Sequence, residues 1–274
     1  MKVIWFNGNF GNQIFYCAFK DYLEEKYPKE TVYSFIDPQC PDVLIESRTN
    51  LSLPKHNIVI TILSFIIFKV LGVLFRRIPP RCVPKWYCSK GDLHDSASFF
   101  GHSMQEKYYY EQKDSGWLSI KSKSSYSSDY LMYQNLIESH NAICVHVRRG
   151  DYVKTGSLYA DLSASDYYER AISLAKEELP EGELFFFSDD MEFVKERFKG
   201  EKAYFVDCNR GKDSYLDMKL MSLAKVNIMA NSTFSYWGAY MGHEKKIVIY
   251  PKVWFTKESG RVAPSIMLDS WIGL

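Results

Sequence analysis

The sequence predicts an α/β protein of two lobes, with a doubly wound parallel sheet in the C-terminal lobe. From about residue 140 onward, short apolar runs rich in Val, Ile and Phe alternate with segments of helical periodicity, the pattern of a parallel sheet. Polar clusters follow three of these runs, at the strand ends where such sheets bind ligands. A chain of 274 residues accommodates two lobes, which we place at residues 1–139 and 140–274.

Composition excludes several classes of protein. Hydrophobic residues make up 46% of the chain and charged residues 24%, which excludes wholesale disorder. The net charge of +1 argues against nucleic acid as a partner. The six cysteines include no C-x-x-C pair and so give no support for a zinc or redox site. No secretory signal stretch precedes the first predicted strand, and the expected compartment is the cytoplasm.

The N-terminal lobe opens with a strand, a glycine turn and a helix. Val3–Phe6 is the strand, residues 7–11 form the turn, and Asn12–Glu25 carries an apolar stripe of helical spacing. Another strand is expected at Thr31–Ile36. The free N–H groups at the start of the helix favour an anion, with a tight turn of any α/β domain as the alternative. The candidate residues at this turn are Gly11, Asn12 and Gln13.

Ile58–Phe75 is the most apolar segment of the chain. Its length is near the lower limit for a membrane span, but Lys69 interrupts it. We therefore expect a helix that is buried or lies on a membrane surface rather than one that crosses the bilayer. The basic residues that follow, Arg76, Arg77 and Arg81, suit an anionic membrane face.

The second half of the chain alternates between helices and strands. Helices are expected at 130–140, 165–178, 191–198 and 215–224, and strands at 143–147, 184–187, 203–206, 226–230 and 246–250. Residues 231–235 end the fourth of these strands and open a further helix that runs through residue 241. In a parallel sheet the carboxyl ends of these strands face the same side.

Three strand ends on that side carry polar clusters, namely His146–Asp151, Ser188–Asp190 and Asn231–Ser235. The guanidinium groups of Arg148 and Arg149 match a diphosphate, although pairing with structural carboxylates would also explain two arginines here. Ser232, Thr233 and the N–H groups at the next helix start also suit phosphate. The combination describes a nucleotide-diphosphate pocket without a P-loop.

The acidic and imidazole groups of these clusters have more than one interpretation. Asp189 or Asp190 suits the N1–H and amino group of guanine. A magnesium or manganese site is the alternative, but adjacent acids on a strand end diverge and two arginines already supply positive charge, so we expect no metal. His146 is either a satisfied core histidine or a hydrogen-bond partner of the nucleotide.

Four motifs, taken together and in order, resemble the α-1,2-fucosyltransferases of glycosyltransferase family 11. They are residues 8–15 (GNFGNQIF), 146–152 (HVRRGDY), 187–190 (FSDD), and Asp217-x-x-Leu220-Met221-Ser222 followed by residues 230–239 (ANSTFSYWGA). The resemblance implies a two-lobed GT-B-like fold with a Rossmann-like donor lobe. It further implies GDP-β-L-fucose as donor, inversion at the anomeric carbon, no metal or other cofactor, and the 2-hydroxyl of a terminal β-galactoside as acceptor. Asn9, Thr233 and Tyr236 depart from the common family pattern.

The resemblance and the motif positions together suggest roles for individual residues. Arg148 would neutralise the charge growing on the leaving β-phosphate. Asn12 would face the cleft, and Asp151 is the nominated general base, although pairing with an arginine would lower its pKa and make it a poor one. Gly11, Gln13 and Arg149 would support the site. The predicted donor-binding residues are His146, Arg148, Asp189, Asp190, Asn231, Ser232, Thr233, Phe234 and Ser235.

Two other classes of function remain open at this point. The chain could bind a nucleotide sugar or a carbohydrate without transferring it, or it could be a membrane-spanning interaction protein built on Ile58–Phe75. The acceptor glycan is also open, since O-antigen, capsule and free oligosaccharide all suit the pattern. Residues 26–139 match little of the family pattern, and we expect acceptor choice to lie there.

Overall fold

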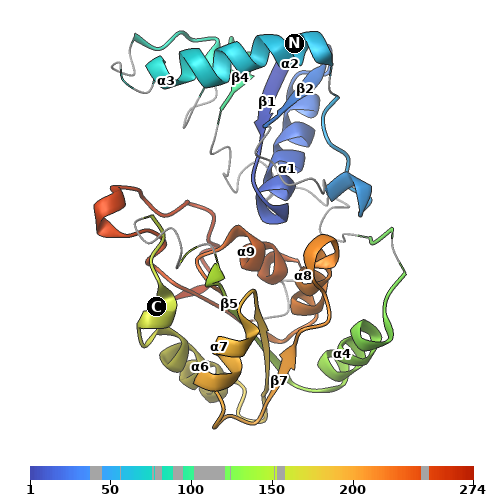
Figure 1. Cartoon of the computed structure of the whole chain (residues 1–274), viewed down its shortest axis with the longest axis vertical. Coiled ribbons are helices and arrows are strands. Elements are labelled where there is room, and N and C mark those ends of the chain that lie inside the picture. The colour runs from blue at the N-terminus through green and yellow to red at the C-terminus, as the bar shows by residue number, and fades with distance from the viewer. Residues whose placement is uncertain are drawn as a thin grey trace. The chain divides into compact units, whose positions relative to one another are not determined.

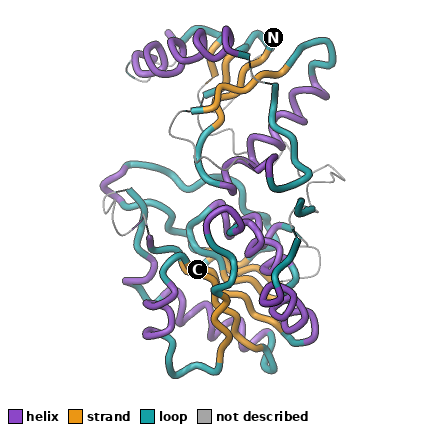
Figure 2. The backbone as a smooth tube through the Cα atoms, turned by 45° about the vertical axis from the view of Figure 1, so that its right-hand side comes forward, coloured by secondary structure: helices purple, strands orange, loops and turns teal. Residues whose placement is uncertain are grey.

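The computed structural model shows two compact α/β units, Met1–Trp117 and Leu118–Leu274 (Figures 1 and 2). It describes residues 1–37, 45–55, 57–75, 77, 82–88, 95–101, 121–123, 125–150, 152, 158–241 and 247–274. The division lies earlier than the predicted boundary at residues 139 and 140. The reason is helix α4 (Ser128–Ser139), which belongs to the C-terminal unit: the hydroxyl of Tyr133 donates a hydrogen bond to the carbonyl of Phe205 (3.1 Å).

The N-terminal unit contains a four-stranded parallel sheet in the order β2-β1-β4-β3. The strands are β1 (Lys2–Phe6), β2 (Val32–Ile36), β3 (Tyr87–Cys88) and β4 (Phe99–Phe100), with the short helix η1 at Ile45–Ser47. The predicted strands at Val3–Phe6 and Thr31–Ile36 are confirmed. β3 and β4 are only two residues long and were not predicted.

Helix α1 (Phe10–Lys26) follows β1 across the glycine turn and begins two residues before the predicted start. Asn9 is extended, and its carbonyl accepts hydrogen bonds from the backbone N–H groups of Asn12 (2.9 Å) and Gln13 (3.1 Å). Gly8 has a φ of +78°, and a Cβ there would lie 2.3 Å from Nδ2 of Asn12. A glycine is therefore required for the chain to turn from strand to helix at this point.

The apolar segment forms one continuous helix, composed of α2 (Ile58–Phe65), the π-helical segment η2 (Ile66–Leu71) and α3 (Gly72–Phe75). Asn57 caps its start, because its side-chain oxygen accepts from the backbone N–H of Val59 at 2.9 Å. By length and composition it is the one helix, within the described residues, that could cross a membrane, yet only 22% of it is buried. One side packs on the sheet and the other is exposed, so the helix is not buried as a whole.

The C-terminal unit is built on a six-stranded parallel sheet in the order β10-β9-β8-β5-β6-β7. Counted along the chain from β5, this is the Rossmann order 3-2-1-4-5-6 read in reverse. The doubly wound parallel sheet predicted for this half is confirmed. The elements after α4 are β5 (Ala142–Val147), η6 (Leu162–Ala164), α6 (Tyr167–Glu178), β6 (Glu183–Ser188), α7 (Met191–Arg197), β7 (Ala203–Val206), η7 (Gly211–Asp213), α8 (Tyr215–Ser222), β8 (Val226–Ile228), α9 (Thr233–Tyr240), β9 (Ile247–Tyr250), η9 (Lys257–Ser259) and β10 (Ile272–Gly273).

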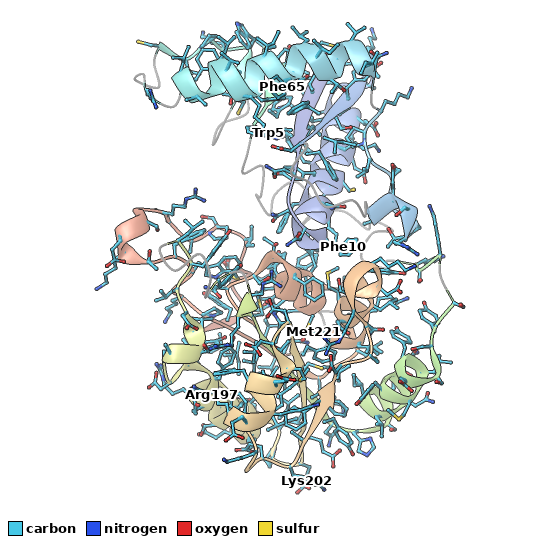
Figure 3. The ribbon with its side chains drawn as sticks, viewed as in Figure 1. Trp5, Phe10, Phe65, Arg197, Lys202 and Met221 are labelled. Carbon is cyan, nitrogen blue, oxygen red and sulfur yellow. The ribbon has the colours of Figure 1, made fainter. Side chains whose placement is uncertain are left out.

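The core of this unit explains why β5 is the central strand. All six of its residues are buried, as expected for a strand covered on both faces. Phe186 of β6 stacks on Phe198 and Phe205, with ring centroids 4.6 and 5.6 Å apart. On the other face α8 and α9 approach closely, because Gly238 of α9 leaves room for Met221 of α8, one of the side chains labelled in Figure 3. The helices thus hold the sheet and fix the strand ends.

Phe186→Ala should destabilise the C-terminal unit. The ring is fully buried and stacked on two others, so its removal leaves a cavity, and we expect the free energy of unfolding to fall by about 3–5 kcal/mol. Leu131→Ala, at an exposed position of α4, is the matched control and should change stability by less than about 0.5 kcal/mol. Denaturant unfolding followed by circular dichroism measures both. Equal effects of the two substitutions would contradict the packing described.

Candidate functional site

The three polar strand ends lie at one edge of the C-terminal sheet. β5 pairs with β6 on one side and with β8 on the other, so the segments that follow these strands are neighbours. Ser188 joins the ends of β5 and β6, because its hydroxyl donates to the carbonyl of Val147 (2.8 Å) and accepts from the backbone N–H of Asp190 (3.0 Å). The chain winds in opposite directions from β5 and β8, and open α/β sheets bind ligands at such a switch point. The predicted clustering of the three strand ends is confirmed.

Asp189 is the centre of this edge. One of its carboxylate oxygens lies 2.9 Å from Nη1 of Arg148, and the other accepts from the backbone N–H of Arg149 at 2.9 Å. Gly150 makes room for it, since a Cβ there would lie 2.4 Å from the Asp189 carboxylate. Arg148 and Asp189 are both about one quarter exposed, so the pair remains accessible to a ligand. The guanidinium of Arg148 also lies 5.5 Å from the ring centre of Tyr152.

Arg149 is bound by the scaffold on several sides. Its Nε donates to Asp190 at 3.1 Å and its Nη1 to the hydroxyl of Ser163 at 2.6 Å. The guanidinium lies 3.6 Å from the ring centre of Phe193. Asp190 in turn accepts from the backbone N–H of Phe193 and so caps α7. These contacts are those of a residue that braces a loop, and they agree with the supporting role predicted for Arg149.

The two acids have partners within the fold, which bears on their predicted contact with a base. Asp189 binds Arg148 and the Arg149 backbone, and Asp190 binds Arg149 and caps a helix. A contact with a base edge stays a prediction for both. Within the described ranges, no group of three or more His, Cys, Asp or Glu side chains is placed to hold a metal ion. The absence of a metal requirement likewise stays a prediction.

His146 lies at the end of β5 and is buried, with 5% of its surface exposed. Burial lowers the pKa of His146 to about 4. The negative charge of Asp189 raises this pKa and the positive charge of Arg148 lowers it, but burial has the largest effect. The ring is therefore neutral at pH 7. Its ring lies 5.4 Å from that of Phe234, and its Nδ1 has no hydrogen-bond partner among the described residues. A buried polar atom of this kind is costly unless a ligand or water satisfies it. The described residues thus do not satisfy the imidazole, and its contact with the nucleotide stays a prediction.

The segment after β8 is held rigidly and then opens α9. The side-chain amide of Asn231 donates to the carbonyls of Ala160 and Trp254, both at 2.9 Å. The hydroxyl of Ser232 caps α9 by accepting from the N–H of Phe234, and that of Ser235 donates to the carbonyl of Ala230 at 3.0 Å. These side-chain groups fix the loop. The hydroxyl of Ser232 accepts a hydrogen bond here and can still donate its own proton, so phosphate contacts from Ser232, Thr233 and the backbone at the start of the helix stay predictions.

Four predicted residues lie outside the described part of the C-terminal unit. Asp151 lies outside the described residues. Gly11, Asn12 and Gln13 belong to the N-terminal unit. The side chain of Gln13 is fully buried and its Nε2 donates to the carbonyl of Gly8 at 3.2 Å, so it supports the glycine turn.

Sequence reasoning missed an aromatic wall beside Arg148. The rings of Tyr152 and Tyr159 stack with centroids 4.0 Å apart, and Phe255 follows at 5.4 Å from Tyr159. The hydroxyl of Tyr152 donates to the carbonyl of Asn231 at 3.0 Å, which links the end of β5 to the end of β8. In the sequence, the only sign of these stacked rings is that Tyr152 closely follows the two arginines. The contact between Tyr159 and Phe255 could not be predicted, because these residues lie far apart in the sequence.

Comparison with known proteins assigns the chain to a family. A model of glycosyl transferase family 11 matches residues 82–274, which include every strand of the C-terminal sheet. The chain belongs to this family. Family 11 membership agrees with the motifs around Arg148 and Asn231, which lie within the matched range.

Two relatives from Escherichia coli share part of the sequence. An O-antigen biosynthesis glycosyltransferase, WbnK, is 38% identical over 152 residues, which cover 54% of this chain and 49% of the relative. An alpha-1,2-colitosyltransferase is 34% identical over 174 residues, which cover 61% and 59%. The chain thus spans 49% of the length of the first of these relatives and 59% of the second.

A solved structure supports the fold alone. The E. coli ADP-heptose lipopolysaccharide heptosyltransferase II superposes with a TM-score of 0.52 at 11% identity, covering 100% of this chain and 90% of that one. Together with the two parallel α/β units, this gives the family 11 chain a two-lobed GT-B-like fold, as predicted.

Asp217, quoted in the family motif but assigned no role, should make stability depend on pH. Burial raises the pKa of Asp217 to about 8. The side chain of Asn209, which donates to its Oδ1 at 2.7 Å, lowers this pKa, whereas the nearby charge of Asp207 raises it. An unfolded Asp titrates near about 3.9. Between these values the folded state holds a proton that the unfolded state has lost, so stability falls as pH rises toward about 8.

Asp217→Asn should flatten this slope. The amide keeps an oxygen for Asn209 and cannot ionise, so we expect the melting temperature of the variant to exceed that of the parent increasingly from about pH 5 to about pH 8. Thermal melts across this range provide the measurement. Asp166→Asn, at an exposed carboxylate, is the control and should leave the slope unchanged. A parallel pair of curves for Asp217→Asn and parent would show that Asp217 is ionised throughout.

Proposed function

We propose that the chain is an inverting α-1,2-fucosyltransferase that moves L-fucose from GDP-β-L-fucose to the 2-hydroxyl of a terminal β-galactoside. Membership in family 11 supports glycosyl transfer, and the relatives named for O-antigen synthesis and alpha-1,2-colitosyl transfer support the class of glycan and the linkage. The observation that carries the proposal is the accessible Arg148–Asp189 pair at the switch point of the Rossmann-like sheet.

In the proposed reaction the acceptor 2-hydroxyl attacks the anomeric carbon of fucose. The bond from that carbon to the β-phosphate oxygen breaks, its electron pair leaves with GDP, and the hydroxyl proton passes to a base or to solvent. Arg148 stabilises the growing phosphate charge while Asp189 holds its guanidinium in place. A guanidinium carries five N–H donors, so one arginine can bind a carboxylate and a phosphate together.

Other residues at the edge assist binding. The neutral His146 offers its Nδ1, which has no partner among the described residues, to the nucleotide. The α9 N-terminus favours the phosphates. The proposal includes no metal, because the arginine and the helix supply the positive charge. The acceptor is a surface glycan or an oligosaccharide, and a lipid-linked glycan is included.

A second donor is favoured by one observation, the relative named for colitosyl transfer. Colitose lacks the 3-hydroxyl of fucose. A site that hydrogen-bonds this hydroxyl rejects the deoxy sugar by about 10⁴-fold or more, whereas an apolar site discriminates by about a hundredfold or less. Rates with GDP-fucose and GDP-colitose therefore separate the two donors.

The activity is tested by incubating the full chain with GDP-fucose and a panel of β-galactosides in the presence of EDTA. We expect a product with fucose linked α1→2 to galactose, identified by NMR. Turnover that appears only after Mn²⁺ is added would contradict the metal-free mechanism. Tight binding of GDP-fucose without transfer to any acceptor would favour a non-catalytic nucleotide-sugar-binding protein.

Arg148→Ala should lower kcat about a hundredfold, or about 3 kcal/mol, since it removes a charge contact formed most strongly in the transition state. Arg148→Lys keeps the charge but loses the fork and should recover part of the rate. Arg170→Ala, at an exposed arginine of α6, is the matched control and should leave kcat unchanged. Near-normal turnover of Arg148→Ala, with the fold intact by circular dichroism, would exclude the leaving-group role.

A further inference from the structure

The helix over residues 58–75 presents an uncovered apolar stripe. Its outer face consists of Ile58, Ile62, Ile66, Val70 and Leu74, which recur every four residues and are each between 49% and 72% exposed. Such a stripe on a folded unit marks a surface for a protein or a membrane. The helix lies outside the range matched by the family model, so the shared chemistry of the family does not account for it.

The opposite side of the helix is anchored to the N-terminal sheet. Phe68 is fully buried, and its ring lies 5.3 Å from that of Trp5 and 5.7 Å from that of Phe35. Figure 3 labels Trp5 on this inner side, below the helix. A helix with one side fixed in a folded core cannot place all of its surface in lipid. Eighteen residues also rise only about 27 Å, less than a bilayer core of about 30 Å.

Lys69, the charge within the helix, is turned away from the outer face. Its Nζ lies 2.6 Å from the carboxylate of Asp37, which is 4% exposed and also accepts from Nε1 of Trp5 at 2.8 Å. The ammonium group further lies 4.8 Å from the centre of the Trp5 ring. The charge that interrupts the apolar run in the sequence is thus neutralised on the inner side, and the outer face keeps an unbroken apolar stripe.

The sequence around the helix carries charge of one sign only. From Ser47 to Gly91 there is no Asp or Glu, and the basic residues are Arg48, Lys55, Lys69, Arg76, Arg77, Arg81, Lys85 and Lys90. Within the described residues, Lys55, Arg77 and Lys85 are exposed. Trp86, 37% exposed, packs against Phe75 at the end of the helix. Basic residues and a tryptophan beside an apolar stripe match the interface of an anionic bilayer.

We propose that the outer face docks in the plane of an anionic lipid bilayer, with its apolar side chains in the interface and the exposed Lys55, Arg77 and Lys85 on the lipid headgroups. The bilayer explains both features, because burial of apolar side chains and attraction to anionic headgroups add together. A second copy of this chain fits less well, since it would bring the same positive charge against itself. The inference rests on the N-terminal unit and does not depend on the proposed transfer reaction.

Flotation of the full chain with lipid vesicles tests the proposal. We expect recovery with vesicles of 70% phosphatidylcholine and 30% phosphatidylglycerol to exceed recovery with pure phosphatidylcholine by about tenfold or more, and the excess to shrink as salt is raised. Equal recovery with both compositions, or none with either, would overturn the proposal.

Variants separate the apolar contribution from the electrostatic one. I62E/I66E/V70E places charge on exposed positions of the outer face and should weaken binding to anionic vesicles by at least about a hundredfold. R77E/K85E should abolish the preference for anionic lipid. The matched control is V253E/V262E, which adds glutamates at exposed valines of the C-terminal unit and should reduce binding much less.

Melting temperatures of all variants must stay near that of the parent, because every substituted side chain is exposed. Sedimentation velocity then tests the alternative that a second copy of this chain, rather than a bilayer, covers the outer face. A parent dimer that I62E/I66E/V70E converts to a monomer, with no vesicle binding by either, would assign the outer face to a second copy and overturn the proposal.

Discussion

The ion pair between Arg148 and Asp189 is the contact on which the candidate site depends. It joins the residue after β5 to the residue after β6, and the same carboxylate also binds the backbone of Arg149. It helps to hold the guanidinium of Arg148 in one direction at the strand end. Gly150 is part of the same arrangement, because a side chain there would occupy the position of the carboxylate. The pair therefore places a rigid cation at the switch point of the sheet, where a diphosphate would bind.

Two adjacent arginines have different surroundings, and this decides their proposed roles. Arg149 is enclosed by Asp190, Ser163 and the ring of Phe193, so it stabilises the loop after β5. Arg148 forms a partly exposed pair with Asp189 and lies beside the stacked rings of Tyr152 and Tyr159. A positive charge that stabilises a leaving group must be held in place yet reach the ligand. Arg148 and Arg149 are exposed to similar extents, 23% and 20%, so the scaffold contacts of Arg149, and not its burial, favour Arg148 for the proposed role.

Much of the C-terminal unit could be predicted because its signals are local. Buried parallel strands read as short apolar runs, and the three polar clusters follow such runs, so the edge they share could be placed before the contacts were known. The stack of Tyr152, Tyr159 and Phe255 could not, since Phe255 is distant in sequence from the two tyrosines. The partners of Asp189 and Asp190 were missed for the same reason, because nothing local distinguishes a carboxylate that faces a base from one that holds an arginine.

The helix at residues 58–75 shows a different limit of sequence reasoning. Its outer and inner sides are both apolar, so periodicity cannot tell which one packs on the sheet, and the lysine within it marks neither. The structure resolves this through Asp37, a buried carboxylate that holds Lys69 on the inner side and so determines which residues remain outside. An exposed apolar stripe is costly for a protein that stays in water, and it is stabilised only by a partner. If the acceptor is a lipid-linked glycan, docking on the bilayer would confine enzyme and acceptor to one surface and raise their rate of encounter.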